Sequence, residues 1–357
     1  MRVLMLVPSI KAAGPINVVL SIICEARKNN IDVLLVEIRE SEESSYKNIL
    51  QSYMDRKIVF LGRSSFGGVS KFKKIINNFK PDVIHSHGFF PDLYNGFLAR
   101  KKIVRVSTCH NVIHEDYTNV YGFLKGRVFS KIHYYNYKFC IDAVIGCSNT
   151  VSKNIVDHLV HPGKVFTIYN GVNIEKFRPI SEDEKNDRKK NEGFLSKDIY
   201  VYCGGLDVVK RVPDLIKIFQ KKKCNDSILI ILGDGVDLKK CVQAVKGDNI
   251  ILKGRVSNPE YYLQMGDYVV SNSSSEGYPL AILEAIACGC SAFLSEIPAH
   301  LEILEKYPDK IFSINLLLKT INNIGYNDFN FDSLGQELMA KQYFRKYIEL
   351  SIGKGHI

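Results

Sequence analysis

The chain has 357 residues, of which 46% are hydrophobic and 24% are charged, so it is long enough for two globular domains. No apolar run has the length of a transmembrane helix, and the first ten residues resemble a strand rather than a signal peptide, so we expect a cytoplasmic protein. The net charge of +10 suits an anionic partner, but no nucleic-acid-binding motif accompanies it, and we expect no nucleic acid. The nine scattered cysteines include no CxxC pair and predict reduced, buried thiols.

In the first half of the chain, short apolar runs alternate with segments of helical periodicity. A helix is expected over Val18–Arg27, directly after the first strand. The strands that we expect cover residues 3–7, 33–38, 57–61, 81–87, 103–108 and 143–148. Strands that alternate with helices predict a parallel sheet covered by helices on both faces.

The alternation stops over residues 178–198, a charged segment that is typical of a linker or of the exposed start of a domain. It then resumes, and the strands that we expect there cover residues 199–206, 227–235, 249–254, 267–273 and 291–296. We therefore predict two Rossmann-like α/β domains, residues 1–175 and 176–335, with ligands beyond the carboxyl ends of their strands. The remaining segment, 336–357, contains an amphipathic helix from about Gln336 to Leu350 that suits packing on either domain.

The segment SSSEGYPLAILEAIACGC predicts a helix over Leu280–Ala287, with Pro279 in its first turn and Gly289 at its end. Glu276 precedes this helix and Glu284 lies more than one turn inside it. At about 1.5 Å per residue, these carboxylates are too far apart for a catalytic dyad. They suit the two ends of one extended ligand, such as a diphosphate flanked by two sugars, with the phosphates at the free N–H groups of the helix start. The alternative is a solvated Glu276 and a capping Glu284.

Glycines and basic residues at other predicted strand ends offer further phosphate contacts. Gly205 follows a strand in CGGL, and Lys210 and Arg211 precede the next helix, where a lysine can balance phosphate charge. Gly233 in LGDG and Gly14 in AAGP also follow predicted strands. Plain turns and a surface basic pair would produce the same patterns.

Histidines cluster in HSHG and TCHN, each at the end of a predicted strand. His85 and His87 share one face of their strand, but no cysteine or carboxylate completes a metal site, and no DxD motif follows a strand, so no metal is expected. We interpret His85 as a packed or hydrogen-bonded residue. His110, beside Asn111 in a loop, is the better candidate for contact with a reacting group.

Residues 121–140 form a basic, aromatic segment with two interpretations. Its apolar stripe at helical spacing consists of Tyr121, Leu124, Val128, Ile132, Tyr135 and Phe139, and its cations off that stripe are Lys125, Arg127, Lys131 and Lys138. The segment is either a helix that touches the head groups of an anionic membrane or an amphipathic helix whose stripe packs into the core. We favour the core helix.

Together these segments resemble glycosyltransferase family 4, which has the GT-B fold of two facing Rossmann-like domains with a deep cleft between them. The resemblance covers nearly the whole chain in the right order. It is carried most specifically by EGYPLAILEAIACGC, and also by HSHG, TCHN, CSNTVSKNIV, YNGVNIEKFRP and the GGL and KR elements.

The resemblance implies a role for each candidate residue. The catalytic residues would be Glu276, near the reacting carbon of the donor sugar, and His110, beside the transferred sugar. Glu284 would hold the nucleotide ribose, Lys210 would neutralise the diphosphate, and the final helix would cross back to the first domain. The donor-binding residues would be Gly14, Gly205, Lys210, Arg211, Gly233, Gly277, Tyr278, Pro279, Leu280 and Glu284.

Two departures from the family pattern concern the phosphate contacts. Gly205 stands where the family often has an arginine, so that Arg211 would have to substitute or donor affinity would be lower. The first loop reads AAGPIN instead of containing a double glycine.

The expected activity is metal-independent, retaining transfer of a hexosyl-type sugar from a UDP- or GDP-linked donor, without a cofactor. The acceptor would be a glycan or a lipid-linked sugar in the synthesis of a bacterial surface polysaccharide such as O-antigen, capsule or exopolysaccharide, with possible peripheral contact to an anionic membrane. The alternatives are a nucleotide-sugar epimerase of the same fold and a weakly catalytic partner protein that binds sugar nucleotide.

Overall fold

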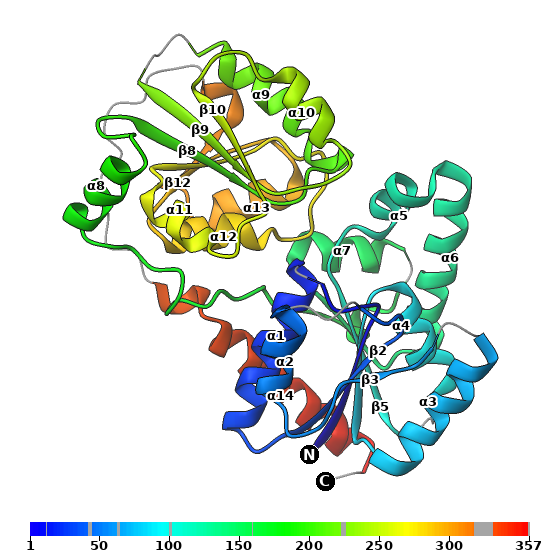
Figure 1. Cartoon of the computed structure of the whole chain (residues 1–357). Coiled ribbons are helices and arrows are strands. Elements are labelled where there is room, and N and C mark those ends of the chain that lie inside the picture. The colour runs from blue at the N-terminus through cyan, green and yellow to red at the C-terminus, as the bar shows by residue number, and fades with distance from the viewer. Residues whose placement is uncertain are drawn as a thin grey trace. The chain divides into compact units, whose positions relative to one another are not determined.

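The computed structural model describes residues 1–11, 13–41, 45–62, 65–99, 102–158, 160–222, 226–317 and 331–355. The chain divides into two compact units, each built around its own sheet (Figure 1). Unit 1 comprises Met1–Gly171 and Gln336–Ile357, and unit 2 comprises Val172–Gly335. The terminal segment therefore belongs to the first unit. No helix within the described ranges is long and apolar enough to cross a membrane.

Unit 1 contains a parallel sheet in the order β3-β2-β1-β4-β5-β6-β7. The first strand, β1, is an interior strand, and the chain adds strands outward on both sides of it. Met5 in β1 lies opposite Leu35 of β2 and His85 of β4. The strands are β1 Arg2–Val7, β2 Asp32–Glu37, β3 Val59–Phe60, β4 Val83–His87, β5 Val104–Cys109, β6 Ala143–Gly146 and β7 Val165–Thr167. The helices are α1 Gly14–Lys28, α2 Ser45–Ser52, α3 Ser65–Phe79, α4 Phe89–Leu93, α5 Ile113–Tyr121, α6 Phe123–Phe139, α7 Asn149–Asp157 and α14 Gln336–Gly353.

Unit 2 contains a second parallel sheet, in the order β10-β9-β8-β11-β12-β13. Tyr200, Phe219 and Phe293 lie in its core. The strands are β8 Asp198–Cys203, β9 Ser227–Leu232, β10 Ile250–Gly254, β11 Tyr268–Ser271, β12 Ser291–Leu294 and β13 Ile311–Ser313. The helices are α8 Glu182–Asn191, α9 Val212–Gln220, α10 Leu238–Ala244, α11 Pro259–Met265, α12 Leu280–Ala287 and α13 Pro298–Lys306.

The prediction of two parallel α/β sheets is confirmed, because the apolar runs are buried on both faces as parallel strands require. The strands β7 and β13 were not predicted. Each has only three residues and lies at the edge of its sheet, which leaves too short a run for a periodic signal. The eight described cysteines are free thiols; five are buried as predicted, but Cys24, Cys140 and Cys203 are only half-buried, and Cys224 lies outside the described residues.

The charged segment 178–198 contains helix α8 and belongs to unit 2, so it is the exposed start of a domain, one of the two predictions, and not a linker. Ser181 caps the helix by accepting a hydrogen bond from the N–H of Glu184. Lys185, which is buried, and Lys189 lie 2.8 and 2.7 Å from the carboxylate of Asp267, just before β11. The ion pairs join a highly charged helix to the sheet without an apolar face, and hydrophobic periodicity cannot reveal such an arrangement.

The terminal helix α14 packs on unit 1 through buried tyrosines. The Tyr347 hydroxyl lies 2.6 Å from Nδ1 of His85, and the Tyr343 hydroxyl lies 3.0 Å from Oγ1 of Thr108. At the start of the helix, Ser21 of α1 donates a hydrogen bond to Gln336. These contacts attach the end of the chain to the first sheet, near the carboxyl ends of β4 and β5.

The prediction for residues 121–140 is correct for the helix and wrong for its orientation. Residues 123–139 form one helix, α6, and Gly122, at φ +79°, separates it from α5, which ends at Tyr121. The stripe assigned to the core is exposed: Leu124, for example, is 77% exposed and Phe139 59%. The opposite face of α6, which carries His133, Asn136 and Tyr137, is the buried one. Polar side chains are buried there because they find hydrogen-bond partners inside the unit.

Candidate functional site

In unit 2, strand β11 leads through residues 272–279 to the start of helix α12. Pro279 is the N-cap residue of the helix, and no side chain within the described residues caps this end by a hydrogen bond. The helix ends at Ala287, with Cys288 as its C-cap residue, followed by Gly289 at φ +96°. The first N–H groups of such a helix have no intrahelical acceptor and carry the positive end of the helix dipole, so they suit an anion.

Two side chains named from the sequence meet beside this helix. The Lys210 ammonium, at the end of a short 3-10 turn after β8, lies 2.5 Å from Oε1 of Glu276. The hydroxyl of Ser273 donates to the same oxygen at 2.8 Å. The side chains of Glu276 and Lys210 are 10% and 24% exposed, so the pair is largely buried but still reachable by a ligand. A positive and a negative group therefore lie side by side, where a diphosphate and a sugar can each find a partner.

Backbone contacts hold the two loops that carry this pair. The N–H of Ser274 donates to the carbonyl of Val209 at 2.8 Å, and Nε of Arg211 donates to the carbonyl of Asn272 at 3.0 Å. Arg211 has φ +47°, in the left-handed region. Its guanidinium thus joins the loops in this structure, and the sequence suggested a phosphate contact for it.

The predicted donor-site glycines allow the loops after β8 and β9 to approach closely. A Cβ on Gly233 would lie 1.8 Å from the carbonyl oxygen of Gly204, and one on Gly235 would lie 2.6 Å from that of Leu206. A Cβ on Gly205 would meet Asp207 at 2.7 Å. The loops after β8 and β9 are therefore packed backbone against backbone.

Glu284 lies on α12 away from any partner. Its carboxylate makes no hydrogen bond or ion pair with a described residue, although it is partly buried beside the ion pair of Lys176 and Glu260. Burial raises the pKa of Glu284 to about 7, against the opposing effect of Lys176. A half-buried carboxylate without donors is poorly satisfied, and hydroxyl groups of a ligand would supply what it lacks.

His300, on α13, is a residue of this region that the sequence interpretation missed. It is 1% exposed, and its Nδ1 lies 2.9 Å from the carbonyl of Ser295, whose hydroxyl donates to the carbonyl of Ser273. The tautomer with hydrogen on Nδ1 leaves Nε2 as a buried acceptor without a partner among the described residues. Burial lowers the pKa of His300, and the charges of Glu276 and Lys210 both act on it. The available signal was a histidine four residues after the end of the predicted strand 291–296.

In unit 1, three histidines gather at the carboxyl ends of β4 and β5. The His85 and His87 rings lie 4.2 Å apart, and Nδ1 of His87 lies 2.9 Å from Nε2 of His110. His85 is fully buried and bonded to Tyr347 and Thr108, as its interpretation as a packed residue requires. Burial lowers the pKa of His110 to about 4, so this half-buried ring is neutral at pH 7 and is able to accept or donate one hydrogen bond.

Gly14 begins helix α1, directly after Ala13 as N-cap residue, and no side chain caps this end within the described ranges. It is exposed, so a ligand can approach its backbone. Ala12, in the same loop, lies outside the described residues.

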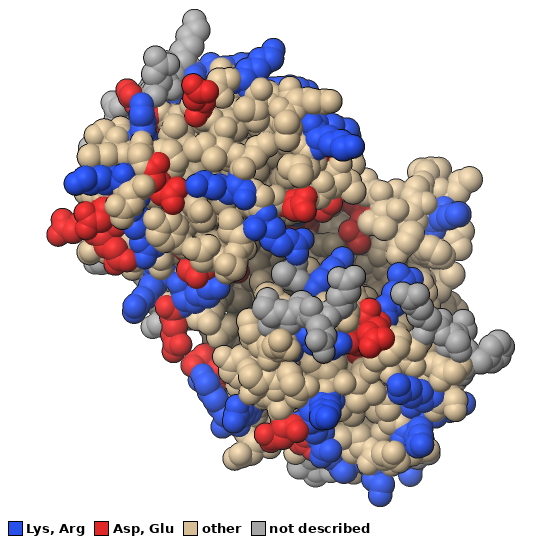
Figure 2. Space-filling view, in the orientation of Figure 1, with Lys and Arg blue, Asp and Glu red and all other residues tan. Residues whose placement is uncertain are grey.

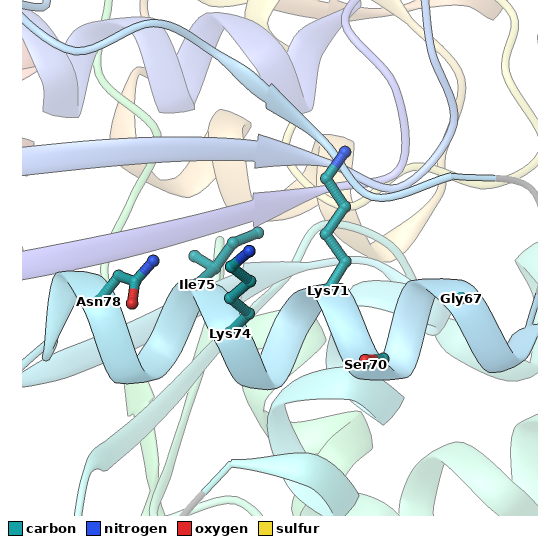
Figure 3. Close-up of a pocket in the computed structure, with 6 residues that line it drawn as sticks. All are labelled: Gly67, Ser70, Lys71, Lys74, Ile75 and Asn78. Atoms are coloured by element: carbon teal, nitrogen blue, oxygen red, sulfur yellow. The ribbon is translucent and has the colours of Figure 1, made fainter.

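An open surface pocket of about 620 Å³ runs along α3, lined by Gly67, Ser70, Lys71, Lys74, Ile75 and Asn78 (Figure 3). Lys71, Lys74 and Asn78 project from one side of the helix, and the Lys71 ammonium lies 5.7 Å from the centre of the Phe60 ring. None of the residues predicted for the site lies in this pocket. Lys, Arg, Asp and Glu side chains are scattered over the visible surface of both units (Figure 2), and no group of three or more potential metal ligands occurs within the described residues.

Both units match family models. Residues 14–176 match the model for Glycosyltransferase Family 4, and residues 183–314 match that for Glycosyl transferases group 1. The chain is 26% identical over 272 residues to the capsular polysaccharide biosynthesis glycosyltransferase CapH of Staphylococcus aureus, which covers 74% of this chain and 73% of the relative. It is 23% identical over 320 residues to the O-antigen biosynthesis glycosyltransferase WclY of Escherichia coli, covering 86% of this chain and 83% of the relative.

Solved structures share the architecture. The crystal structure of Anabaena Alr3699/HepE in complex with UDP and glucose matches with a TM-score of 0.82 at 15% identity, over 98% of this chain and 99% of that one. WaaG, a glycosyltransferase involved in lipopolysaccharide biosynthesis, matches with a TM-score of 0.69 at 9% identity, over 99% and 94%. The two domain models, matched in order along one chain with two parallel α/β sheets, place this protein among the glycosyltransferases of the GT-B fold, with a family 4 domain followed by a group 1 domain.

Proposed function

We propose that this glycosyltransferase moves a hexosyl-type sugar from a UDP- or GDP-linked donor to a glycan or lipid-linked acceptor during synthesis of a bacterial surface polysaccharide. The observation that carries the proposal is the Lys210–Glu276 pair beside the start of α12, with Glu284 further along the same helix. Among the described residues, no side chain caps this helix start and none pairs with Glu284. The names of the relatives CapH and WclY support a polysaccharide product, and the UDP and glucose bound to HepE support a nucleotide-sugar donor.

In the proposed mechanism, the donor diphosphate binds at the start of α12, where the N–H groups and the Lys210 ammonium offset its charge as the bond to the sugar breaks. This positive charge comes from the protein itself, so we propose that neither a divalent metal nor a cofactor takes part. Glu284 accepts hydrogen bonds from the ribose hydroxyls. The negative charge of Glu276 stabilises the positive charge that develops at the anomeric carbon.

We propose a retaining outcome. Inversion requires a general base that removes the acceptor proton opposite the leaving group. The Glu276 oxygen that faces Lys210 already accepts hydrogen bonds from both the ammonium and Ser273, so it is not placed to take the acceptor proton. His110, neutral at pH 7, is the residue that we propose for catalysis from unit 1. The free thiols are compatible with a reducing compartment, and we propose that the enzyme acts in the cytoplasm.

The test is a screen of radiolabelled UDP- and GDP-hexoses with the purified protein, a lipid-linked glycan acceptor and Glu276→Gln as the control variant. Transfer of label to the acceptor by the wild type, with strong loss in the variant, supports the proposal. An altered sugar on an intact nucleotide would show an epimerase, and binding without turnover for every donor would show a sugar-nucleotide-binding protein. Either result contradicts transfer.

A further inference from the structure

Helices α5 and α6 lie side by side and form a hairpin (Figure 1). Helix α6 exposes a row of large apolar side chains. We call this surface the α6 apolar face and define it as Leu124, Val128, Ile132, Tyr135 and Phe139, which are between 39% and 77% exposed. On the side of α5 and α6 that Figure 2 shows, few charged side chains are visible. At about 100° per residue, the members of the face fall within an arc of about 80°. A contiguous exposed patch of this kind marks an interaction site.

The rotation of α6 is fixed by its inner face. A Cβ on Gly126 would lie 2.6 Å from the backbone of Thr118, so the two helices are in direct backbone contact. Further along, Nε2 of His133 donates to the buried Asp92 at 2.6 Å and Nδ1 accepts from Tyr117 at 2.6 Å. The hydroxyl of Tyr137 also donates to Asp92. Turning the apolar face inward would break these buried hydrogen bonds. The hydrogen bonds therefore fix the rotation of α6 and leave the apolar face in contact with solvent.

Charge complements the apolar face. Helix α6 contains the cations Lys125, Arg127, Lys131 and Lys138, all exposed, and no aspartate or glutamate. On a helical projection, Arg127, Lys131 and Lys138 border one edge of the face and Lys125 borders the other. The acidic residues of the hairpin are in the first turn of α5. The guanidinium of Arg127 lies 5.2 Å from the centre of the Phe123 ring, which is itself exposed.

We propose that the α6 apolar face docks on an anionic lipid bilayer, with the helix lying in the plane of the membrane surface. The apolar side chains would enter the boundary between head groups and acyl chains, and the bordering cations would reach lipid phosphates along their flexible stems. A second copy of the chain is the weaker partner, because a symmetric contact through this face would bring the same row of cations together. This docking does not depend on which sugar or acceptor the enzyme uses.

The test is flotation of the purified full chain with two kinds of vesicle, phosphatidylcholine alone and phosphatidylcholine with one third phosphatidylglycerol, at low and high salt. The expected result is binding to the anionic vesicles that high salt weakens. The variant Leu124→Glu with Val128→Glu should lose at least tenfold in affinity. The variant Lys125→Gln, Arg127→Gln and Lys131→Gln should lose roughly 100-fold, since each cation near an anionic surface contributes about fivefold.

Matched controls come from exposed residues on unit 2 and α14. The control for the apolar face is Val242→Glu with Ile352→Glu, and the control for the cations is Lys190→Gln, Lys221→Gln and Lys239→Gln. Both should bind as the wild type does. Equal losses in test and control variants, or wild-type binding by both test variants, would overturn the proposal. A dimer in light scattering that the Leu124 and Val128 changes convert to a monomer, without vesicle binding, would assign the face to a second copy.

Discussion

The Lys210 ammonium lies 2.5 Å from the Glu276 carboxylate in the absence of a donor. In the proposed mechanism these two groups serve different parts of one ligand, the diphosphate and the sugar. The ion pair therefore holds both side chains in place until a ligand binds and replaces the contact between them. Ser273 is a second donor to Glu276. A ligand that brought only phosphate would take Lys210 and leave Glu276 with Ser273 alone.

Glu276→Gln is expected to act mainly on kcat. The amide keeps the size of the side chain but removes the negative charge, which matters most when positive charge grows at the anomeric carbon. Loss of one such charged interaction, at about 1.5–3 kcal/mol, lowers the rate by roughly ten- to a hundred-fold. Steady-state kinetics and donor titration separate kcat from affinity, and thermal melting checks folding. If Glu276→Gln had normal kcat and weak donor binding, Glu276 would be assigned to donor binding instead of catalysis.

Glu284→Gln is expected to act mainly on donor affinity, by roughly ten- to a hundred-fold, because the ribose contact exists in both the ground state and the transition state. Wild-type affinity should also rise with pH from about 6 to 8, since ribose hydroxyls favour the ionised carboxylate and the pKa of Glu284 in the free protein is about 7. Calorimetric titration of UDP across this range measures both effects. A pH dependence that persists in the variant would belong to another group.

The same carboxyl predicts a pH dependence of stability in the free protein. Burial raises the pKa of Glu284 from 4.5 to about 7, so the folded state holds this proton more tightly than the unfolded state. The resulting stability is present below about pH 4.5 and is lost as the pH rises through about 7. Thermal melting of Glu284→Gln should therefore show a smaller fall in Tm between pH 5 and 8 than the wild type shows. If Tm fell equally with pH in the variant and the wild type, Glu284 would be ionised in both the folded and the unfolded protein over this pH range.

Activity is expected without added metal and in excess EDTA, because Lys210 and the start of α12 provide the positive charge for the diphosphate. Assays with and without the chelator, followed by manganese, decide the question. Activity that EDTA removes and manganese restores would contradict the mechanism. Lys210→Gln removes the ammonium and is expected to lower kcat by at least tenfold, with or without EDTA.

His300 is expected to act as a positioning residue through its Nε2, which has no hydrogen-bond partner among the described residues. His300→Asn keeps a donor for the Ser295 carbonyl but removes Nε2, and His300→Phe removes both. We expect His300→Asn to melt like the wild type with kcat lowered by about tenfold and the donor KM unchanged, and His300→Phe to melt earlier as well. If both variants lose stability and neither changes kcat per folded molecule, His300 is structural only.

Gly233→Ala is expected to destabilise the protein by about 1–3 kcal/mol, because its Cβ would lie 1.8 Å from the Gly204 carbonyl oxygen at a φ of +150°. Gly353→Ala is the control, since a Cβ there meets no atom within 4 Å. Chemical denaturation compares the two. A Gly233→Ala protein as stable as the control would show that the loops after β8 and β9 move apart easily.

The sequence by itself determined the two sheets and the local form of residues 272–289. The start of α12 after Pro279 and its end before Gly289 follow from residue types whose backbone preferences act over a few positions. The separation of Glu276 from Glu284 follows from the helical rise. The packing of His85 was also predictable, since it lies in a strand buried on both faces.

Only the tertiary structure decided which face of α6 is buried. The periodicity of residues 121–140 indicated an apolar stripe and suggested the core for it. The inner face was instead selected by Asp92, more than forty residues away in sequence from His133 and Tyr137, which both donate hydrogen bonds to it. The same reason applies to α8, which Asp267 holds through Lys185 and Lys189. A polar side chain is buried where a distant partner satisfies it, and hydrophobic periodicity contains no information about that partner.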